Sequence, residues 1–196
     1  MPRLPVALIP YLAAFALIVG GYLWYAGDVA SGLAHQRPVN LGGPFTLVDQ
    51  YGHSRTDGDF RGRFMLIYFG YSMCPDVCPT ELGKMADAIA ELGPRAKRVV
   101  PVFITVDPQR DTPPHLKDYV SEFGSQFVGL TGTLDQIKSV AKEYNVYFRK
   151  RPLGDGNYGM DHTSTIYLIG PNGKLANVYT EGTNPDDIAN DLKKRL

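Results

Sequence analysis

The sequence is poor in cysteine and has no excess of charge of either sign. Only two of its 196 residues are cysteines, and both lie in one short segment, so a disulfide-rich scaffold and a four-cysteine zinc site are excluded. Twenty lysines and arginines balance twenty aspartates and glutamates, so no nucleic-acid-binding surface is predicted. The 21 glycines and 15 prolines are spread along the chain. The composition therefore predicts one globular domain plus an attachment.

Charge is missing altogether from residues 4–25. A helix of this length crosses about 30 Å of hydrocarbon. Aromatic residues cluster at its far end, as in an interfacial belt: Tyr22, Trp24 and Tyr25. Because Arg3 precedes the span, the positive-inside rule keeps residues 1–3 in the cytoplasm and exports the rest. We interpret residues 4–25 as a transmembrane anchor, and a cleaved signal peptide ending near Ala26 is the alternative.

Residues 26–40 are polar, contain glycine and lack an apolar period, so they are predicted to be a linker to a domain at residues 41–196. A mitochondrial presequence would be richer in arginine and serine. The predicted location is therefore the bacterial cytoplasmic membrane, with a single pass and the domain facing the periplasm.

The segment from Leu66 to Thr80 carries both cysteines and organises the domain. Leu66–Phe69 is a short apolar run bounded by Gly70, which predicts a buried strand. Pro79 suits the first position of a helix, and apolar residues then recur at helical spacing up to Gly93. The two cysteines thus lie where a strand gives way to a helix.

Cys74 and Cys78 are four residues apart, so one turn of chain brings them together. The positive end of the helix dipole is expected to stabilise a thiolate at Cys78. A structural disulfide is the alternative, but so short a loop constrains little of the unfolded chain. We interpret the pair as reactive or metal-binding.

Strands and helices alternate through the rest of the domain, which predicts crossover connections and a parallel core sheet. Further strands are expected at 99–106 and 127–130, and helices at 112–123, 133–144 and from 184. One hairpin is expected from residues 45–48 and the segment after Gly52, and another at 165–179. Residues 149–159 combine charges, glycines and Pro152 without an apolar period, so a long mobile loop is expected there.

Parallel strands place Asp107 and the cysteines at one edge of the sheet, because each follows a core strand. His162 comes just before a strand. It joins the same edge only if that strand is antiparallel to the others, which periodicity does not decide.

Three motifs, in order, resemble the signatures of the Sco/SenC family. They are YFGYSMCPDVCP at 68–79, VDPQRDTP at 106–113 and YGMDHT at 158–163. The resemblance implies a thioredoxin-like α/β fold, a central mixed sheet flanked by helices, whose antiparallel strand brings His162 to the cysteines. It also implies that Cys74, Cys78 and His162 bind one copper ion, as Cu(I) or Cu(II), with Asp107 near the metal or at a partner surface.

Two soft thiolates and an imidazole favour copper, and a structural zinc site would need a fourth protein ligand. Asp161 is a candidate to orient His162 by a hydrogen bond. The predicted function is that of a metallochaperone, not primarily an enzyme, which delivers copper to the dinuclear copper site of a cytochrome oxidase. The partners expected are the copper-accepting oxidase subunit, a copper donor and a thiol reductant that keeps the pair reduced.

Two alternatives remain open. The first is a thiol–disulfide oxidoreductase that reduces the recipient's cysteines. Spacing argues against it, because reductases of this fold carry a CxxC motif and a facing proline, which the segment 161–166 lacks. The second is a peroxide-reducing or redox-sensing protein, with Cys78 oxidised and Cys74 resolving it.

Overall fold

The computed structural model describes residues 15, 17–25 and 41–196. The chain divides into two units, Met1–Val39 and Asn40–Leu196. The predicted linker at 26–40 and most of the predicted span at 4–25 lie outside the described residues. Within the described ranges, no helix has both the length and the apolar character needed to cross a membrane.

The second unit alternates strands and helices, as the sequence predicts. In chain order its elements are β1 (Thr46–Asp49), β2 (Ser54–Thr56), the 3-10 helix η2 (Asp57–Phe60), β3 (Phe64–Gly70), α2 (Val77–Ala90), the 3-10 helix η3 (Gly93–Arg98), β4 (Val99–Thr105), α3 (Pro113–Ser121), β5 (Val128–Thr131), α4 (Leu134–Glu143), β6 (Phe148–Gly154), β7 (Asn157–His162), β8 (Thr165–Ile169), β9 (Leu175–Thr180) and α5 (Pro185–Arg195).

Seven of these strands form one mixed sheet in the order β2-β1-β5-β4-β3-β8-β9. The central strands β3, β4 and β5 are parallel. β8 pairs antiparallel with β3, from Met65 opposite Ile169 to Tyr68 opposite Ile166. The expected mixed sheet is thus confirmed, and the antiparallel β8 begins at the edge where β3 ends.

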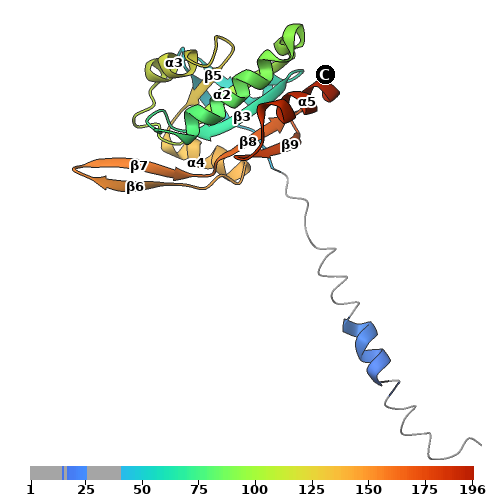
Figure 1. Cartoon of the computed structure of the whole chain (residues 1–196). Coiled ribbons are helices and arrows are strands. Elements are labelled where there is room, and N and C mark those ends of the chain that lie inside the picture. Colours follow the sequence, from blue (N-terminus) through green and yellow to red (C-terminus); the bar gives the residue numbers. More distant parts are fainter. Residues whose placement is uncertain (1–14, 16, 26–40) are drawn as a thin grey trace, which may run out of the picture. The chain divides into compact units, whose positions relative to one another are not determined.

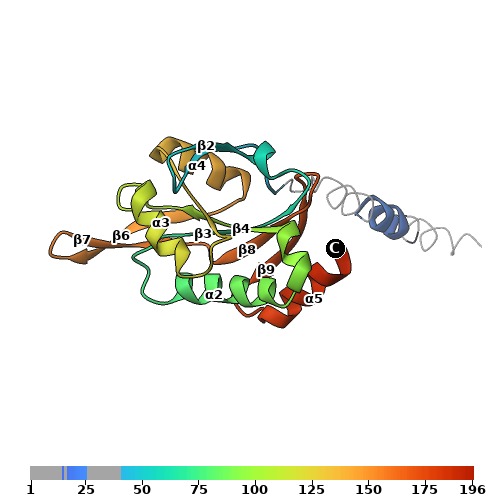
Figure 2. The same ribbon diagram turned by 90° about the horizontal axis from the view of Figure 1, so that it is seen from above.

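Every residue of β3 and β4 is buried. Such strands must be covered on both faces, which explains their continuous apolar runs. Helices α2, α3 and α5 lie along one face of the sheet and α4 along the other (Figures 1 and 2). The loops that carry Cys74 and Asp107 start at the carboxyl ends of β3 and β4.

Local sequence signals set several of the boundaries. The expected capping box at α4 is present. The Thr133 hydroxyl accepts from the backbone N–H of Gln136, and the side-chain oxygen of Gln136 accepts from the backbone N–H of Thr133. Gly52 has φ +85°, which the turn between β1 and β2 requires. α2 begins at Val77, so Pro79 lies inside the first turn, where a missing N–H costs nothing.

The prediction of a long loop at residues 149–159 is wrong. β6 and β7 pair antiparallel as a two-stranded sheet of their own, here called the ribbon (residues 148–162), which projects from the body of the domain (Figure 1). Its apolar residues are too few to show a period. Its two strands are joined by backbone hydrogen bonds and by cross-strand ion pairs, such as Arg149 with Asp161, and its inner face packs on the domain.

Candidate metal centre

The cysteine loop follows directly from β3. Cys78 lies in the first turn of α2 and is fully buried, whereas Cys74 in the preceding loop is partly exposed. The close approach of α2 to β3 needs glycine at the end of the strand. A Cβ on Gly70 would lie 2.8 Å from Cys78 Sγ and 2.9 Å from the ring of Tyr68. Gly70 therefore lets the sulfur of Cys78 pack against the sheet.

His162 reaches the cysteines from the other side, at the end of β7. Its Nε2 lies 3.4 Å from Cys78 Sγ, and the ligand atoms of Cys74, Cys78 and His162 all lie within 4.8 Å of one another. In the described part of the chain no other three histidine, cysteine or acidic residues form such a group. The fold thus gathers three residues spread over 88 positions of sequence.

The imidazole of His162 is oriented by its neighbours. Its ring stands edge-on to the rings of Tyr68 and Tyr71, with centroids 6.1 and 5.9 Å away. Its Nδ1 lies 3.1 Å from the carbonyl oxygen of Thr163. Because a carbonyl only accepts, Nδ1 carries the proton in this contact, and Nε2 presents its lone pair toward the sulfurs.

Cys74, and not Cys78 where the helix dipole led us to expect it, is the cysteine whose pKa is lowered. A hydrogen bond from the thiol of Cys78 lowers the pKa of Cys74. The same hydrogen bond, together with burial, raises the pKa of Cys78.

The donor set fits a soft metal ion. Two sulfurs and one neutral imidazole nitrogen are the ligands that copper prefers, and the partial exposure of Cys74 gives an ion a route in. No carboxylate joins the group, which disfavours a hard ion such as Mg²⁺ or Ca²⁺.

The predicted accessory acids lie near the site but do not enter it. Asp107 is buried, with its carboxylate held by the guanidinium of Arg110 and by the hydroxyl of Tyr158 at 3.0 Å. Asp161 lies on the opposite face of β7 from His162, where Arg149 and Arg151 bind its carboxylate at 3.0 and 2.9 Å. The orienting contact predicted for Asp161 is made by the carbonyl of Thr163 instead.

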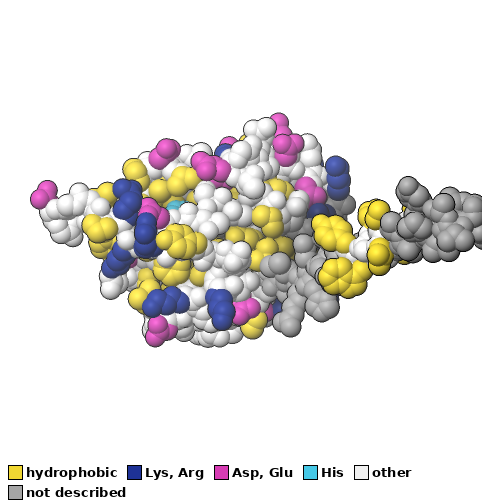
Figure 3. Space-filling view, turned by 90° about the horizontal axis from the view of Figure 1, so that it is seen from below, with side chains coloured by type: hydrophobic (Ala, Val, Ile, Leu, Met, Phe, Trp, Pro, Cys, Tyr) yellow, Lys and Arg dark blue, Asp and Glu magenta, His cyan; other side chains and the backbone are white. Residues whose placement is uncertain are grey.

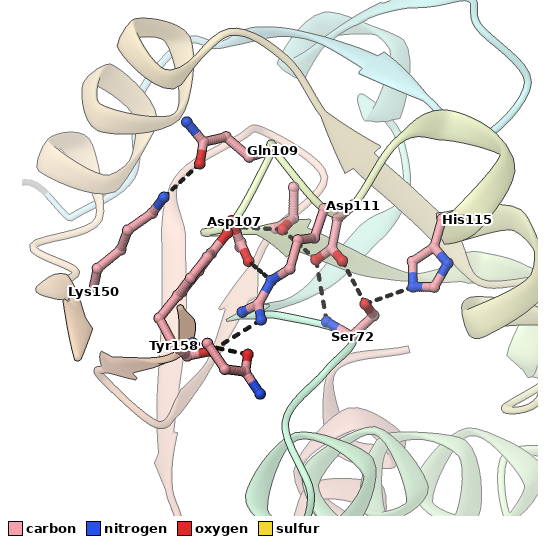
Figure 4. A network of polar contacts seen from close by, with 10 residues as sticks. Ser72, Asp107, Gln109, Asp111, His115, Lys150 and Tyr158 are labelled. Atoms are coloured by element: carbon pink, nitrogen blue, oxygen red, sulfur yellow. Dashed lines mark hydrogen bonds and ion pairs between the residues drawn. The ribbon is translucent and has the colours of Figure 1, made fainter. Parts of the chain in front are cut away.

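Sequence reasoning missed one connection, through Asp111. Its buried carboxylate accepts from Thr105 Oγ1 at 2.5 Å, from the backbone N–H of Ser72 at 3.1 Å and from the Ser72 hydroxyl (Figure 4). Ser72 lies two residues before Cys74, so Asp111 fixes the start of the cysteine loop. Nothing in the spacing of the sequence shows a contact between residues 39 positions apart.

Comparison with known proteins shows which family the chain belongs to. A sequence model of the family described as SCO1/SenC matches residues 34–196. The chain belongs to the SCO1/SenC family. The human mitochondrial SCO1 homologue is 42% identical over 152 residues, which are 76% of this chain and 50% of that protein. This member therefore spans about half the length of its human relative.

Solved structures of the family share the fold. A copper-bound structure of ScoI from Bradyrhizobium japonicum is 43% identical, with a TM-score of 0.75, and the match covers 80% of this chain and 99% of that one. BsSco, described as a Sco-family cytochrome c oxidase assembly protein with a disulfide switch, is 30% identical with a TM-score of 0.64 over 81% of this chain and 95% of that one. The family resemblance of the three motifs and the thioredoxin-like fold are thereby confirmed.

Proposed function

We propose that this protein is a copper carrier, which binds one copper ion through Cys74, Cys78 and His162 and passes it to the dinuclear copper site of a cytochrome oxidase during assembly. The observation that carries the proposal is the convergence of these three ligand atoms within 4.8 Å. The copper-bound relative and the oxidase assembly role of BsSco support it.

Three protein ligands suit a carrier better than a permanent site. Tetrahedral metal sites that are purely structural use four protein ligands, whereas an open position admits a ligand from outside. A thiolate of the acceptor can therefore join copper before a ligand of this protein leaves. His162 is the ligand best suited to leave, because it comes from the ribbon and not from the core sheet.

The proposed setting is the bacterial cytoplasmic membrane, with residues 4–25 as an anchor and the domain in the periplasm. In an oxidising compartment the pair needs a thiol reductant before it can ligate copper, since a disulfide offers no thiolate. A copper donor completes the set of partners.

A second candidate function is thiol–disulfide exchange with the acceptor. The adjacent free cysteines and the lowered pKa of Cys74 favour it, because the thiolate is the attacking species in exchange. The two functions differ in their need for His162. Its removal is expected to abolish copper transfer and to leave disulfide exchange largely intact.

The test is copper binding by the reduced, purified full chain under anaerobic conditions. The natural sequence is expected to bind one copper per chain. His162→Ala and Cys78→Ser each remove a ligand, so affinity is expected to fall by more than the roughly 10–100-fold typical of changes next to the ligands. Competition with a chromophoric copper chelator measures the affinity.

His53→Ala is the matched control, because His53 is exposed and lies outside the site. It is expected to bind copper as the natural sequence does. Absence of copper binding by the natural sequence, or equal binding by His162→Ala, would refute the carrier proposal and leave thiol–disulfide exchange as the better explanation.

A further inference from the structure

The ribbon that carries His162 does not extend the seven-stranded sheet by backbone pairing. In the described part of the chain, β6 and β7 form backbone hydrogen bonds to each other but none to the strands of that sheet. The two residues 163–164 join His162 to β8. The position of the imidazole over the cysteines therefore depends on side chains of the ribbon that contact the domain.

The inner face of β7 makes these contacts. Side chains alternate along a strand, so Tyr158, Met160 and His162 project to the same face. Met160 is buried and Tyr158 is partly buried, whereas the exposed pairing of Asp161 with the ribbon arginines occupies the opposite face. Tyr158 thus lies on the same face as the predicted ligand, four residues before it.

Arg110, Asp107 and Tyr158 form a closed triangle, here called the clasp. The Arg110 guanidinium binds the Asp107 carboxylate, donates from Nη1 to the carbonyl of Tyr158 at 2.9 Å, and lies over the Tyr158 ring with its Cζ 3.8 Å from the centroid. The Tyr158 hydroxyl closes the triangle by donating to Asp107 at 3.0 Å (Figure 4). The clasp joins the loop after β4 to the ribbon.

The clasp also contacts the site through Tyr71. Arg110 lies over the ring of Tyr71 at 5.7 Å, and Tyr71 in turn stands edge-on to His162. At the other end of the same loop, Asp111 holds Ser72 of the cysteine loop. Residues 107–111 therefore attach both halves of the site, and they set the distance between the cysteine pair and the histidine.

We propose that Arg110, held between Asp107 and Tyr158, is a positioning residue that fixes His162 over Cys74 and Cys78, and that opening of this clasp governs how fast the metal leaves. The inference rests on the proposed copper-carrying function and deepens it. Arg110 acts through the ribbon and touches none of the three ligands by a hydrogen bond in the structure.

The experiment compares Arg110→Met with Arg151→Met in the full chain. Both remove a ribbon-contacting arginine, but Arg151 pairs with Asp161 on the outer face. Arg110→Met is expected to release Cu(I) to a chelator roughly 10–100-fold faster, the range typical when support around a ligand is lost. Arg151→Met is expected to release it at the natural rate, with one copper bound in both variants.

Two further variants are expected to accelerate Cu(I) release by smaller amounts, and they remain informative if Arg110→Met does not fold. Arg110→Lys keeps the charge beside Asp107 but loses the planar fork that also binds the Tyr158 carbonyl, so partial acceleration is expected. Tyr158→Phe keeps the ring and removes the hydroxyl bond to Asp107, so a smaller acceleration is expected. Thermal melting of each variant reports whether it is folded.

A second readout separates the clasp from the copper proposal. In the metal-free protein the ring currents of Tyr68 and Tyr71 shift the His162 ring protons in the NMR spectrum, and loss of the clasp is expected to move these signals toward free-histidine values. If the natural sequence does not bind copper but the His162 signals move in Arg110→Met, then Arg110 does position His162 and only the copper-carrier proposal fails. The positioning role of the clasp would be overturned if folded clasp variants kept the natural His162 signals and the natural rate of copper release. It would also be overturned if Arg151→Met accelerated release as much as Arg110→Met.

Discussion

The two halves of the candidate metal centre differ in how the fold holds them. The cysteine half belongs to the core, since β3 is buried along its whole length and Cys78 is fully buried against Gly70. The histidine half stands at the base of a projecting ribbon whose residues 149–154 are all exposed. The cysteine half is therefore rigid, whereas the histidine half can move away without disrupting the core. This difference suits a site that must both hold an ion and release it.

The surfaces of the two halves also differ. The ribbon carries exposed Arg149, Lys150 and Arg151, two of them paired with Asp161. Lysine and arginine side chains gather toward the ribbon end of the face shown in Figure 3. Near the cysteines, Asp107 and Asp111 are buried and hydrogen-bonded, and Asp76 of the cysteine loop is exposed. Changes on the outer ribbon should thus alter charge without altering the site.

The largest effect is expected from adding a methyl group to the rigid half. In Gly70→Ala the new Cβ meets Cys78 Sγ at 2.8 Å, so the free energy of unfolding is expected to fall by about 1–3 kcal/mol, as is typical of overpacked cores. Copper affinity is expected to fall with it, because the sulfur must move. Urea denaturation and chelator competition measure the two changes.

Gly159→Ala is the matched change in the ribbon. Its nearest neighbours would lie 3.5 Å away, an ordinary contact, so the free energy of unfolding is expected to change by less than about 0.5 kcal/mol. Equal losses in Gly70→Ala and Gly159→Ala would contradict the contrast between a rigid and a separable half.

A smaller effect, on reactivity alone, is expected within the cysteine half. The lowered pKa of Cys74 keeps its ionised thiolate populated as pH falls, whereas an ordinary thiol of pKa about 8.5 loses its thiolate roughly tenfold per pH unit below that value. In the reduced metal-free protein, alkylation of Cys74 is therefore expected to change little between about pH 8 and pH 6. Cys78, buried and with a raised pKa, is expected to react far more slowly.

Peptide mapping by mass spectrometry measures both alkylation rates. Cys78→Ala is the control, because it removes the hydrogen bond that contributes most to the lowered pKa of Cys74. In this variant the Cys74 rate should fall as pH falls. Faster alkylation of Cys78 than of Cys74 in the natural sequence would contradict the lowered pKa of Cys74.

The smallest effect is expected on the outer face of the ribbon. Asp161→Asn removes ion pairs with Arg149 and Arg151 that are open to solvent, and exposed pairs contribute little to stability. Copper affinity and the melting temperature are both expected to stay close to the natural values. A marked loss of copper in Asp161→Asn would revive the orienting role that the sequence suggested for this residue.

The parts of the fold that depend on local pattern could be predicted from neighbouring residues alone. The continuous apolar runs of β3 and β4, the capping box at Thr133 and the position of the cysteines between a strand and a helix are all readable from neighbouring residues. The family motifs, which join the three predicted ligands, were readable in the same way and were confirmed by comparison with known proteins.

Features that depend on contacts between distant residues became visible only in the folded protein. The two strands of the ribbon pair with each other and its inner face packs on the domain, although its few apolar residues show no period. The lowered pKa of Cys74 and the raised pKa of Cys78 follow from a hydrogen bond between the two thiols and from the burial of Cys78, which no spacing reveals. The bond of Asp111 to Ser72 and the clasp of Arg110 with Tyr158 join segments 39 and 48 residues apart, so they exist only once the sheet has formed.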